Sequence, residues 1–222
     1  MTNIKPYERE YVNYTLGEEI LNSASHFIGA LFGAAALALC IVGSLMQNDT
    51  KMLIGSIVYG ASLILLYSVS FVYHFLPKCR AKKIMRIVDH CTIYLLIAGT
   101  YTPVILSIMN INPLGGWLLL AFVWGVSAIA IIFTAIDFVR YNVFSMICYI
   151  AIGWCIVVDL KDALQALTFS GFMLMLAGGI SYTLGAILYG IGSKIKYFHS
   201  VFHIFVVIGS ILQFLSIILY AI

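Results

Sequence analysis

Long apolar runs separated by short polar segments make up most of this chain. Most of the runs reach the ~20 residues that an α-helix needs to cross a hydrocarbon layer. They are too long and too uniformly apolar to be barrel strands. The pattern therefore predicts an all-α membrane protein, a bundle of seven transmembrane helices. The predicted helices cover about residues 20–46, 52–76, 87–109, 114–136, 143–158 (the shortest), 168–191 and 197–222.

Composition agrees with a chain that has lipid as its main solvent. Hydrophobic residues make up 63% of the 222 residues and charged residues 9%, against roughly 25% charged residues in a soluble domain. We predict one membrane domain, residues 19–222, preceded by a polar tail, residues 1–18. Glu8 and Glu10 stand beside Lys5 and Arg9 in that tail, which is unlike the basic start of a cleavable signal peptide. No basic patch with interleaved aromatic residues indicates a nucleic-acid partner.

The distribution of basic residues predicts how the helices are oriented. Short joints make successive helices antiparallel, so alternate joints lie on the same side of the membrane. Ten of the 12 Lys and Arg residues fall in the tail and in the second, fourth and sixth joints, and only Lys51 and Lys161 fall on the other side. The positive-inside rule then predicts a cytoplasmic N-terminus, an extracellular C-terminus and location in the cell membrane as a multi-pass protein.

With this orientation, the polar residues of the apolar runs gather at one level of the membrane. Ionisable groups at such depths are costly and are read first as functional. All five histidines, together with nearby carboxylates, an amide and a serine, approach the cytoplasmic face. These residues are Glu18, Glu19, Asn22, His26, Ser70, His74, Asp89, His90, His199 and His203.

A metal site is predicted within this layer. His199 and His203 are four residues apart, so a helix places both imidazoles on one face. With His74 they supply three nitrogen ligands, which is the pattern of a catalytic zinc site that keeps one position open. Asp89 is predicted to hydrogen-bond a water molecule activated there. Ser70, one turn before His74, is predicted to orient the ligand or the water.

Each of these residues also has a simpler interpretation. A histidine at a membrane interface is often a polar tip among headgroups, and Asp89, Glu18 and Glu19 are at positions where a negative charge favours the start of a helix. Ser70 is able to bond back to a carbonyl of its own helix. Residues 199–203 read His-Ser-Val-Phe-His, so this motif contains no glutamate base of the HExxH type.

Several motifs, in this order, resemble the haemolysin III family, the bacterial branch of the progestin and adiponectin receptor superfamily. The resemblance extends over about residues 18–215 and includes distant similarity to alkaline ceramidases. The motifs that carry it are Glu19-x2-Asn22-x3-His26, Ser70-x3-His74, Asp89-His90, the stretch 93–103, the stretch 178–189 and His199-x3-His203.

The resemblance implies a seven-helix bundle with Zn²⁺ in the cytoplasmic half of the bilayer. It implies that His74, His199 and His203 bind the zinc, that Asp89 interacts with a water at the ion, and that Ser70 lies beside it. Bacterial members are linked to membrane lipid homeostasis, and the family name comes from a haemolytic phenotype. The chain lacks the long N-terminal domain of the adiponectin receptors, so hormone binding is not expected.

The matching positions Glu19, Asn22, His26 and His90 receive no role from the resemblance. Three functions stay open at this point. They are a zinc-dependent hydrolase of a lipid amide or ester, a non-enzymatic membrane sensor or regulator with a structural zinc, and a pore-forming lysin. The third is disfavoured because no polar stripe runs from one membrane face to the other. A membrane lipid is the expected substrate or sensed ligand, and no oligomeric state is predicted.

Overall fold

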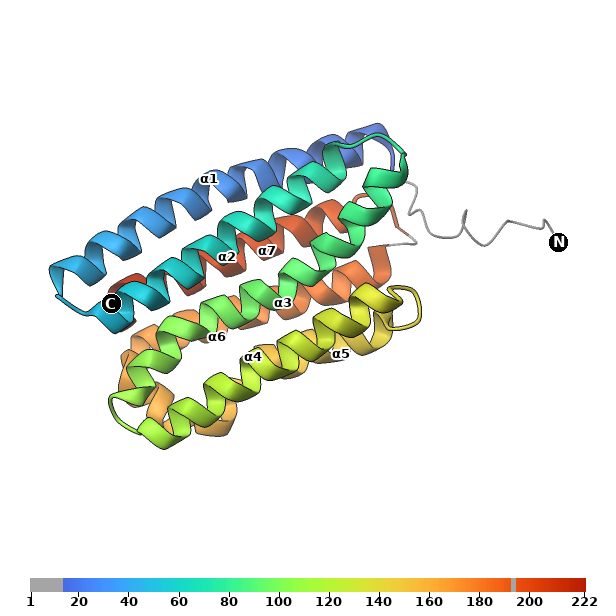
Figure 1. Cartoon of the computed structure of the whole chain (residues 1–222). Coiled ribbons are helices and arrows are strands. Elements are labelled where there is room, and N and C mark those ends of the chain that lie inside the picture. The colour runs from blue at the N-terminus through green and yellow to red at the C-terminus, as the bar shows by residue number, and fades with distance from the viewer. Residues whose placement is uncertain (1–13, 193–194) are drawn as a thin grey trace.

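The computed structural model describes residues 14–192 and 195–222, and within these ranges the protein is helical with no strand. Figure 1 shows an elongated bundle of roughly parallel and antiparallel helices. The helices are α1 (Leu16–Met46), α2 (Thr50–Phe75), α3 (Arg80–Met109), α4 (Pro113–Ile136), α5 (Asn142–Gly153), η1 (Cys155–Asp159), α6 (Leu160–Gly192), α7 (Phe198–Ser216) and η2 (Ile217–Ala221). The all-α prediction is confirmed.

Six helical segments in the described ranges are long and apolar enough to cross a membrane. The predicted count of seven is therefore not reproduced by length and hydropathy. The difference lies in the predicted helix 143–158, because α5 has 12 residues and a span needs about 20. Helical structure runs on through η1 into α6, so the 50 residues Asn142–Ile191 count as one segment.

Hydrogen bonds join the start of α5 and the start of α6 to opposite ends of α4. Ser145, in the first turn of α5, bonds Thr134 near the end of α4. Asp162, at the start of α6, accepts a bond from Asn112 at the opposite end of α4. The non-helical φ and ψ of Thr168 (60° and 170°) interrupt α6 and let its remainder take a new direction.

Two helices begin earlier than the apolar pattern predicts. Thr15 caps α1, and its hydroxyl and Glu18 form a reciprocal capping box, so α1 starts at Leu16 rather than at residue 20. Helix α3 starts at Arg80 rather than at residue 87, because a basic segment ends the hydrocarbon span without ending the helix. The first 13 residues of the predicted tail, as well as Lys194, lie outside the described residues.

The helices pack in a closed order. α1 contacts α2 and α7, α3 contacts α2, α4 and α6, and α6 contacts α7. Small residues permit close approach: a Cβ at Gly29 would collide with the Tyr67 ring, so glycine lets α2 press against α1 there. Large apolar side chains face outwards, for example Ile28, Ile54, Leu118 and Ile132, as expected of surfaces in contact with lipid.

Candidate metal centre

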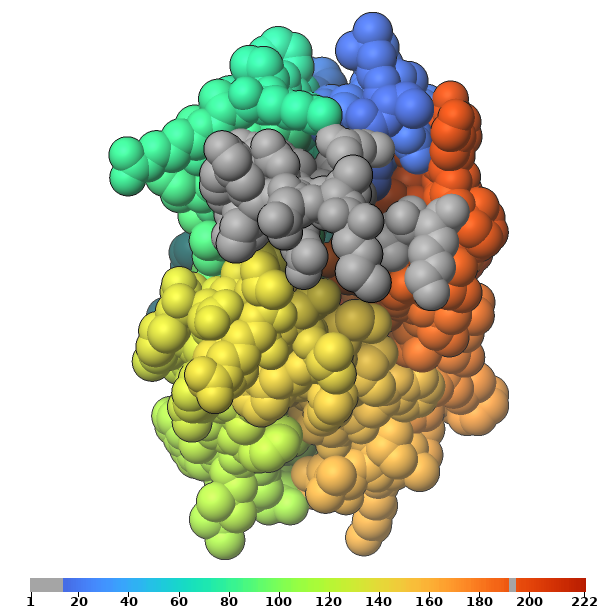
Figure 2. All heavy atoms as spheres, turned by 90° about the vertical axis from the view of Figure 1, so that its right-hand side faces the viewer, coloured from blue at the N-terminus to red at the C-terminus, as the bar shows by residue number. Residues whose placement is uncertain are grey.

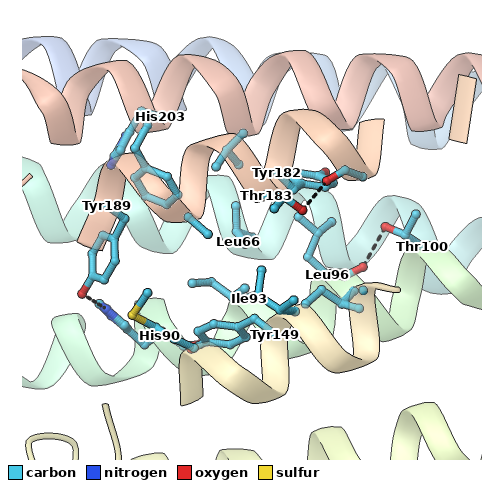
Figure 3. A pocket seen from close by; sticks show the side chains of 18 of the residues that line it. Leu66, His90, Ile93, Leu96, Thr100, Tyr149, Tyr182, Thr183, Tyr189 and His203 are labelled. Carbon is cyan, nitrogen blue, oxygen red and sulfur yellow. Dashed lines mark hydrogen bonds between the residues drawn. The ribbon is translucent and has the colours of Figure 1, made fainter. Parts of the chain in front are cut away.

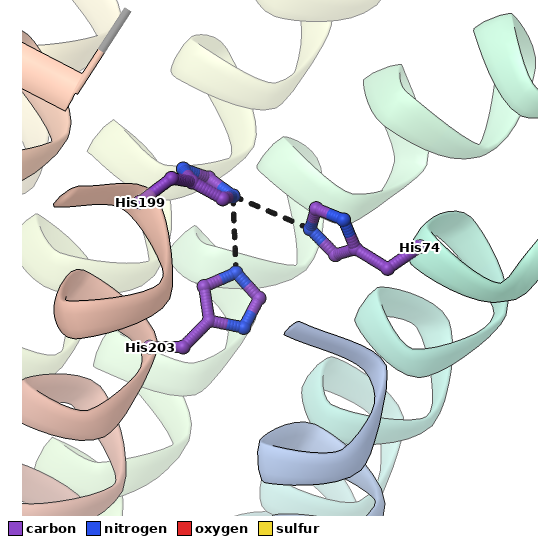
Figure 4. Close-up of side chains that lie close together, drawn as sticks. All are labelled: His74, His199 and His203. Atoms are coloured by element: carbon purple, nitrogen blue, oxygen red, sulfur yellow. Dashed lines mark hydrogen bonds between the residues drawn. The ribbon is translucent and has the colours of Figure 1, made fainter. Parts of the chain in front are cut away.

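Three histidines meet where the end of α2 faces the start of α7. His74 is in the last turn of α2, and His199 and His203 occupy the first two turns of α7. The three side chains are 1–6% exposed. Figure 4 shows the rings converging, with His199 Nε2 3.3 Å from His74 Nε2 and 3.1 Å from His203 Nε2. Side chains 125 residues apart in the sequence are thus in contact.

Two of the three distances between these nitrogens fit a tetrahedral metal ion. Zinc–imidazole bonds of 2.0–2.1 Å at tetrahedral angles place two ligand nitrogens about 3.3–3.4 Å apart. The Nε2 distances of 3.1 and 3.3 Å are close to that edge length. One ligand atom from each of the three histidines lies within 4.8 Å of the others. The described residues therefore include a group of three buried imidazoles that could hold a metal ion.

Helix α1 supports this cluster from one side. Glu19 Oε2 is 2.7 Å from His74 Nδ1, Asn22 Nδ2 is 3.4 Å from the same nitrogen, and Ser25 Oγ is 3.4 Å from His203 Nδ1. A carboxylate can only accept, so His74 carries its proton on Nδ1 when it is neutral, and the Asn22 amide group, itself a donor, makes no hydrogen bond to that nitrogen. The Nε2 lone pair of His74 is then free to bind a metal.

Lys82 joins this arrangement from α3. Its side chain is buried, and its Nζ donates to Glu19 Oε1 at 2.8 Å and to the carbonyl oxygen of Leu76 at 2.8 Å. The sequence led us to count Lys82 only as a positive charge of the second joint. Lys82 and Asp89 are seven residues apart, so both lie on one face of α3. This spacing in the sequence could have indicated that Lys82 points inwards.

Glu18 ties the start of α1 to the start of α7. One oxygen, Oε2, accepts from the Thr15 backbone N–H, and the other, Oε1, accepts from the Tyr197 backbone N–H at 2.7 Å. Tyr197 has the left-handed backbone conformation that precedes α7. The simpler interpretation, that Glu18 favours a helix start, is confirmed, and the residue also helps to position the turn that carries His199.

The remaining predicted residues separate into two groups. Ser70 and Asp89 line a cavity together with His199 and His203. His90 lines the same cavity but is engaged elsewhere: its Nδ1 bonds the Arg86 carbonyl oxygen and its Nε2 bonds the Tyr189 hydroxyl, both at 2.9 Å.

His26 is the unusual member of the predicted layer. Its ring is 3% exposed and stacks on the His203 ring, with centroids 3.7 Å apart. Neither ring nitrogen has a hydrogen-bond partner within the described ranges, although buried polar atoms are nearly always paired. His26 also lines the cavity. It is thus a candidate to bind a ligand there rather than a fourth member of the three-histidine group.

The cavity has a volume of about 140 Å³ and extends from the histidines into the bundle between α3, α5, α6 and α7. Figure 3 shows His90, Tyr189 and His203 at one end, and Thr100 and Thr183 farther in. Asp89 and Tyr101 in its wall are twelve positions apart on α3, a rise of about 18 Å. Most of the wall between is apolar, formed by Leu66, Ile93, Leu96, Ile97, Met146 and Ile150.

Aromatic side chains cover the cluster near the end of the bundle. Tyr14, just before α1, stacks on the His199 ring with centroids 4.6 Å apart, and Tyr189 contacts the same ring at 5.7 Å. Tyr14 was not among the predicted site residues, because it precedes the apolar run. Figure 2 views this end of the bundle, where the starts of α1 and α7 and the α2–α3 junction come together.

Comparison with known proteins yields a consistent set of relatives. A family model described as "Haemolysin-III related" matches residues 14–214. The chain is 39% identical to "Hemolysin-3" of Bacillus cereus over 203 residues, which cover 91% of each protein. It is 34% identical to "Hemolysin-3 homolog" of Bacillus subtilis over 212 residues, 94% of this chain and 97% of that protein. It is also 26% identical over 194 residues to human "Monocyte to macrophage differentiation factor", covering 80% and 76% of the two chains.

Proposed function

The chain belongs to the haemolysin III family, and from that premise we propose that it is a zinc-dependent intramembrane hydrolase of a lipid amide or ester, acting in membrane lipid homeostasis. One observation carries the proposal. Three buried imidazoles lie together, and two of them, His199 and His203, line an apolar cavity whose wall also contains Asp89. Three protein ligands with one open position are the arrangement of catalytic zinc sites.

The donor set supports zinc as the metal. Neutral imidazole suits zinc, and hydrolysis requires no redox change. His74, His199 and His203 would hold the ion, which when bound would polarise a substrate carbonyl and make a nearby water more acidic. The remaining chemistry belongs to the protein's own side chains.

Asp89 is the proposed general base. Its carboxylate would take a proton from the attacking water and return it to the leaving nitrogen or oxygen as the acyl bond breaks. Ser70, which lines the same cavity wall, would hold the carboxyl group in position by a hydrogen bond. His26, with two unpartnered ring nitrogens at the cavity wall, would donate a hydrogen bond to the polar group of the lipid.

The apolar part of the cavity suits one hydrocarbon chain. Its wall extends about 18 Å along α3, more than half of the ~30 Å hydrocarbon thickness. A single acyl chain with its carbonyl beside the histidines would satisfy both the apolar wall and the polar end. The proposed substrate class is accordingly an acylated lipid.

A second function is favoured by a different observation. The three histidines are nearly inaccessible, and Tyr14 stacks directly on His199. A covered site of this kind also suits a structural zinc that fixes α2 against α7 in a sensor or regulator. In that case removal of a ligand would reduce stability and metal content together, and no lipid would be turned over.

We further propose seven membrane crossings in the cell membrane, with the N-terminus in the cytoplasm, the C-terminus outside and the metal site in the cytoplasmic half. The basis is the excess of Lys and Arg on one side, with α5 and η1 together forming the fifth crossing. A phosphatase reporter fused after Ile222 is expected to be active, since this reporter works only outside the cytoplasm. An inactive reporter on a correctly inserted protein would contradict the orientation.

The decisive experiment compares lipid turnover with metal content. Purified zinc-loaded protein in liposomes is expected to release fatty acid from a ceramide or from an acyl ester. His74→Ala should lose both metal and activity, and Asp89→Asn should lose activity alone. Asp162→Asn, which removes a carboxylate at the other end of the bundle, is the matched control. No release by metal-loaded wild type from either lipid class would reject the hydrolase, and steady conductance in planar bilayers would favour a pore.

A further inference from the structure

His74 differs from His203 in what holds its outer nitrogen. His74 Nδ1 lies 2.7 Å from a carboxylate oxygen of Glu19. His203 Nδ1 lies 3.4 Å from the neutral hydroxyl of Ser25. Charge-assisted hydrogen bonds are shorter and about twice as strong as neutral ones. The contact with Glu19 therefore fixes the His74 ring more firmly than Ser25 fixes the His203 ring.

Glu19 is itself held by a second charged partner. Its two oxygens are divided: Oε2 faces His74 and Oε1 accepts from Lys82 Nζ at 2.8 Å. Glu19 is fixed to one rotamer by bonds at both oxygens. Because burial of a lone carboxylate is costly, the ammonium group also provides the compensating charge.

Lys82 in turn is anchored to the helix that carries His74. Its Nζ donates to the carbonyl oxygens of Leu76 and His74, at 2.8 and 3.4 Å, at the C-terminal end of α2. Those carbonyls have no partner further along the helix, and a cation there also complements the helix dipole. An ammonium group has three protons to donate, and all three acceptors belong to this small region of the site.

We propose that Glu19 and Lys82 are positioning residues for the metal: together they fix the Nδ1–H tautomer and the ring orientation of His74, so that its Nε2 lone pair points at the ion. The inference rests on the metal site of the proposed function, although it does not depend on hydrolysis. Carboxylate–histidine–metal arrangements of this kind typically change metal affinity 10- to 100-fold when the outer partner is lost. The pair links α1, α2 and α3 around one ligand.

A merely structural salt bridge would have a different signature. It would stabilise the packing of α1, α2 and α3 whether or not metal is present, and its loss would lower the stability of the metal-free protein. A positioning pair acts on the metal-loaded state. The two roles are therefore separated by measuring metal affinity and the stability of the metal-free protein on the same variants.

The test uses the full chain in detergent, titrated with Zn²⁺ against a chelator and, separately, loaded with Co²⁺ for absorption spectroscopy. Glu19→Gln is expected to weaken Zn²⁺ binding by about 10- to 100-fold and to alter the Co²⁺ visible bands, with little change in the melting temperature of the metal-free protein. Lys82→Met should weaken binding less, and Lys82→Arg should restore most of it. Lys51→Met, an equal loss of charge at the opposite end of α2, should bind as wild type does.

The double variant Glu19→Gln with Lys82→Met supplies a second criterion. Because Lys82 acts through Glu19, the two losses of affinity should be clearly less than additive. Additive losses, or single variants that bind metal as tightly as wild type while melting at lower temperature, would overturn the positioning role and leave the metal site intact. A wild-type protein that binds neither Zn²⁺ nor Co²⁺ would overturn the metal site itself and this inference with it.

Discussion

The imidazole rings of His26 and His203 lie face to face, with centroids 3.7 Å apart and planes inclined by 22°. The stack places an unligated imidazole directly against a proposed metal ligand, at the wall of the cavity. The nitrogens of His26 have no partner within the described part of the chain. A ring that only packed against His203 would not need nitrogen atoms, so the nitrogens of His26 are available for a ligand in the cavity.

Replacing His26 by phenylalanine keeps an aromatic ring against His203 and removes both nitrogens. We expect the variant to bind metal as wild type does, because the stack is retained. Lipid hydrolysis should fall by about 100-fold, the usual effect of deleting one donor to a developing negative charge. Metal content and fatty-acid release, measured on one preparation, check this. A fully active His26→Phe protein would show that the nitrogens do not contact substrate.

Metal removal should destabilise the protein measurably. A ligand bound only to the folded state, present at 1,000 times its Kd, adds about 4 kcal/mol to the free energy of unfolding. Chelation is therefore expected to lower the melting temperature of wild type, and readdition of Zn²⁺ should restore it. His203→Ala should melt at one temperature with or without chelator. A wild-type melting temperature that does not respond to chelator or to added zinc would argue against a bound metal.

The roles of Asp89 and the histidines should separate experimentally. Asp89→Asn removes the proposed base and keeps the shape of the side chain, so metal content should be unchanged. The turnover number is expected to fall by about 10²- to 10⁴-fold, the range for general acid–base catalysis. Ser70→Ala, which removes only the proposed hydrogen bond to Asp89, should have a smaller effect. If Asp89→Asn instead loses as much metal as the histidine variants do, Asp89 is itself a metal ligand.

Much of the fold and the three-histidine group followed from the sequence because each has a strong local signal. Apolar runs of membrane-spanning length predict the helices, and the four-residue spacing of His199 and His203 predicts a shared helix face. His74 was matched to them through its depth in the membrane, which the basic residues of the joints indicate. The three-histidine group of the structure has the same members.

The parts that the sequence missed depend on distances between helices. Glu19 and His74 are 55 residues apart, and no periodicity within α1 indicates which ring the carboxylate contacts. Lys82 was assigned to a loop because basic residues usually end a hydrocarbon span, whereas its long side chain turns back into the protein. The sixth helix was predicted to begin at residue 168, where the structure has the break at Thr168. The fifth helix was predicted to be the shortest but ends earlier than expected, and most of the joint 159–167 is helical, because apolar composition does not reveal where a helix changes direction.

Gly179 provides a way to test what occupies the cavity. It lines the cavity, and a Cβ added there would meet no atom within 4 Å. Gly179→Phe should therefore fill part of the apolar space without distorting the helix. We expect hydrolysis of long-chain lipids to fall while short-chain analogues are still cleaved at near wild-type rates. The control is Gly125→Phe, where a Cβ also meets nothing but the residue lies on the exposed face of α4.

Tyr14 is predicted to slow the exchange of metal between the site and solvent. Its ring lies on His199 and within 5.7 Å of the His74 ring centroid, so it covers two of the three proposed ligands. Burial raises the pKa of Tyr14 far above neutrality, so the ring remains an uncharged phenol at all ordinary pH values. An aromatic contact of this kind is worth about 0.5–1.5 kcal/mol, which corresponds to about a 2- to 12-fold change in rate.

Tyr14→Ala should accordingly release zinc to an excess of chelator several times faster than wild type, at the same stoichiometry. Tyr14→Phe keeps the ring and should exchange at nearly the wild-type rate, because the stacking face and not the hydroxyl covers His199. Stopped-flow chelation measured near pH 6 and pH 8 should give the same ratio between variants, since Tyr14 does not titrate in that range. If Tyr14→Ala exchanges no faster than Tyr14→Phe, metal reaches the histidines by another route, and the cavity is the remaining path to test with Gly179→Phe.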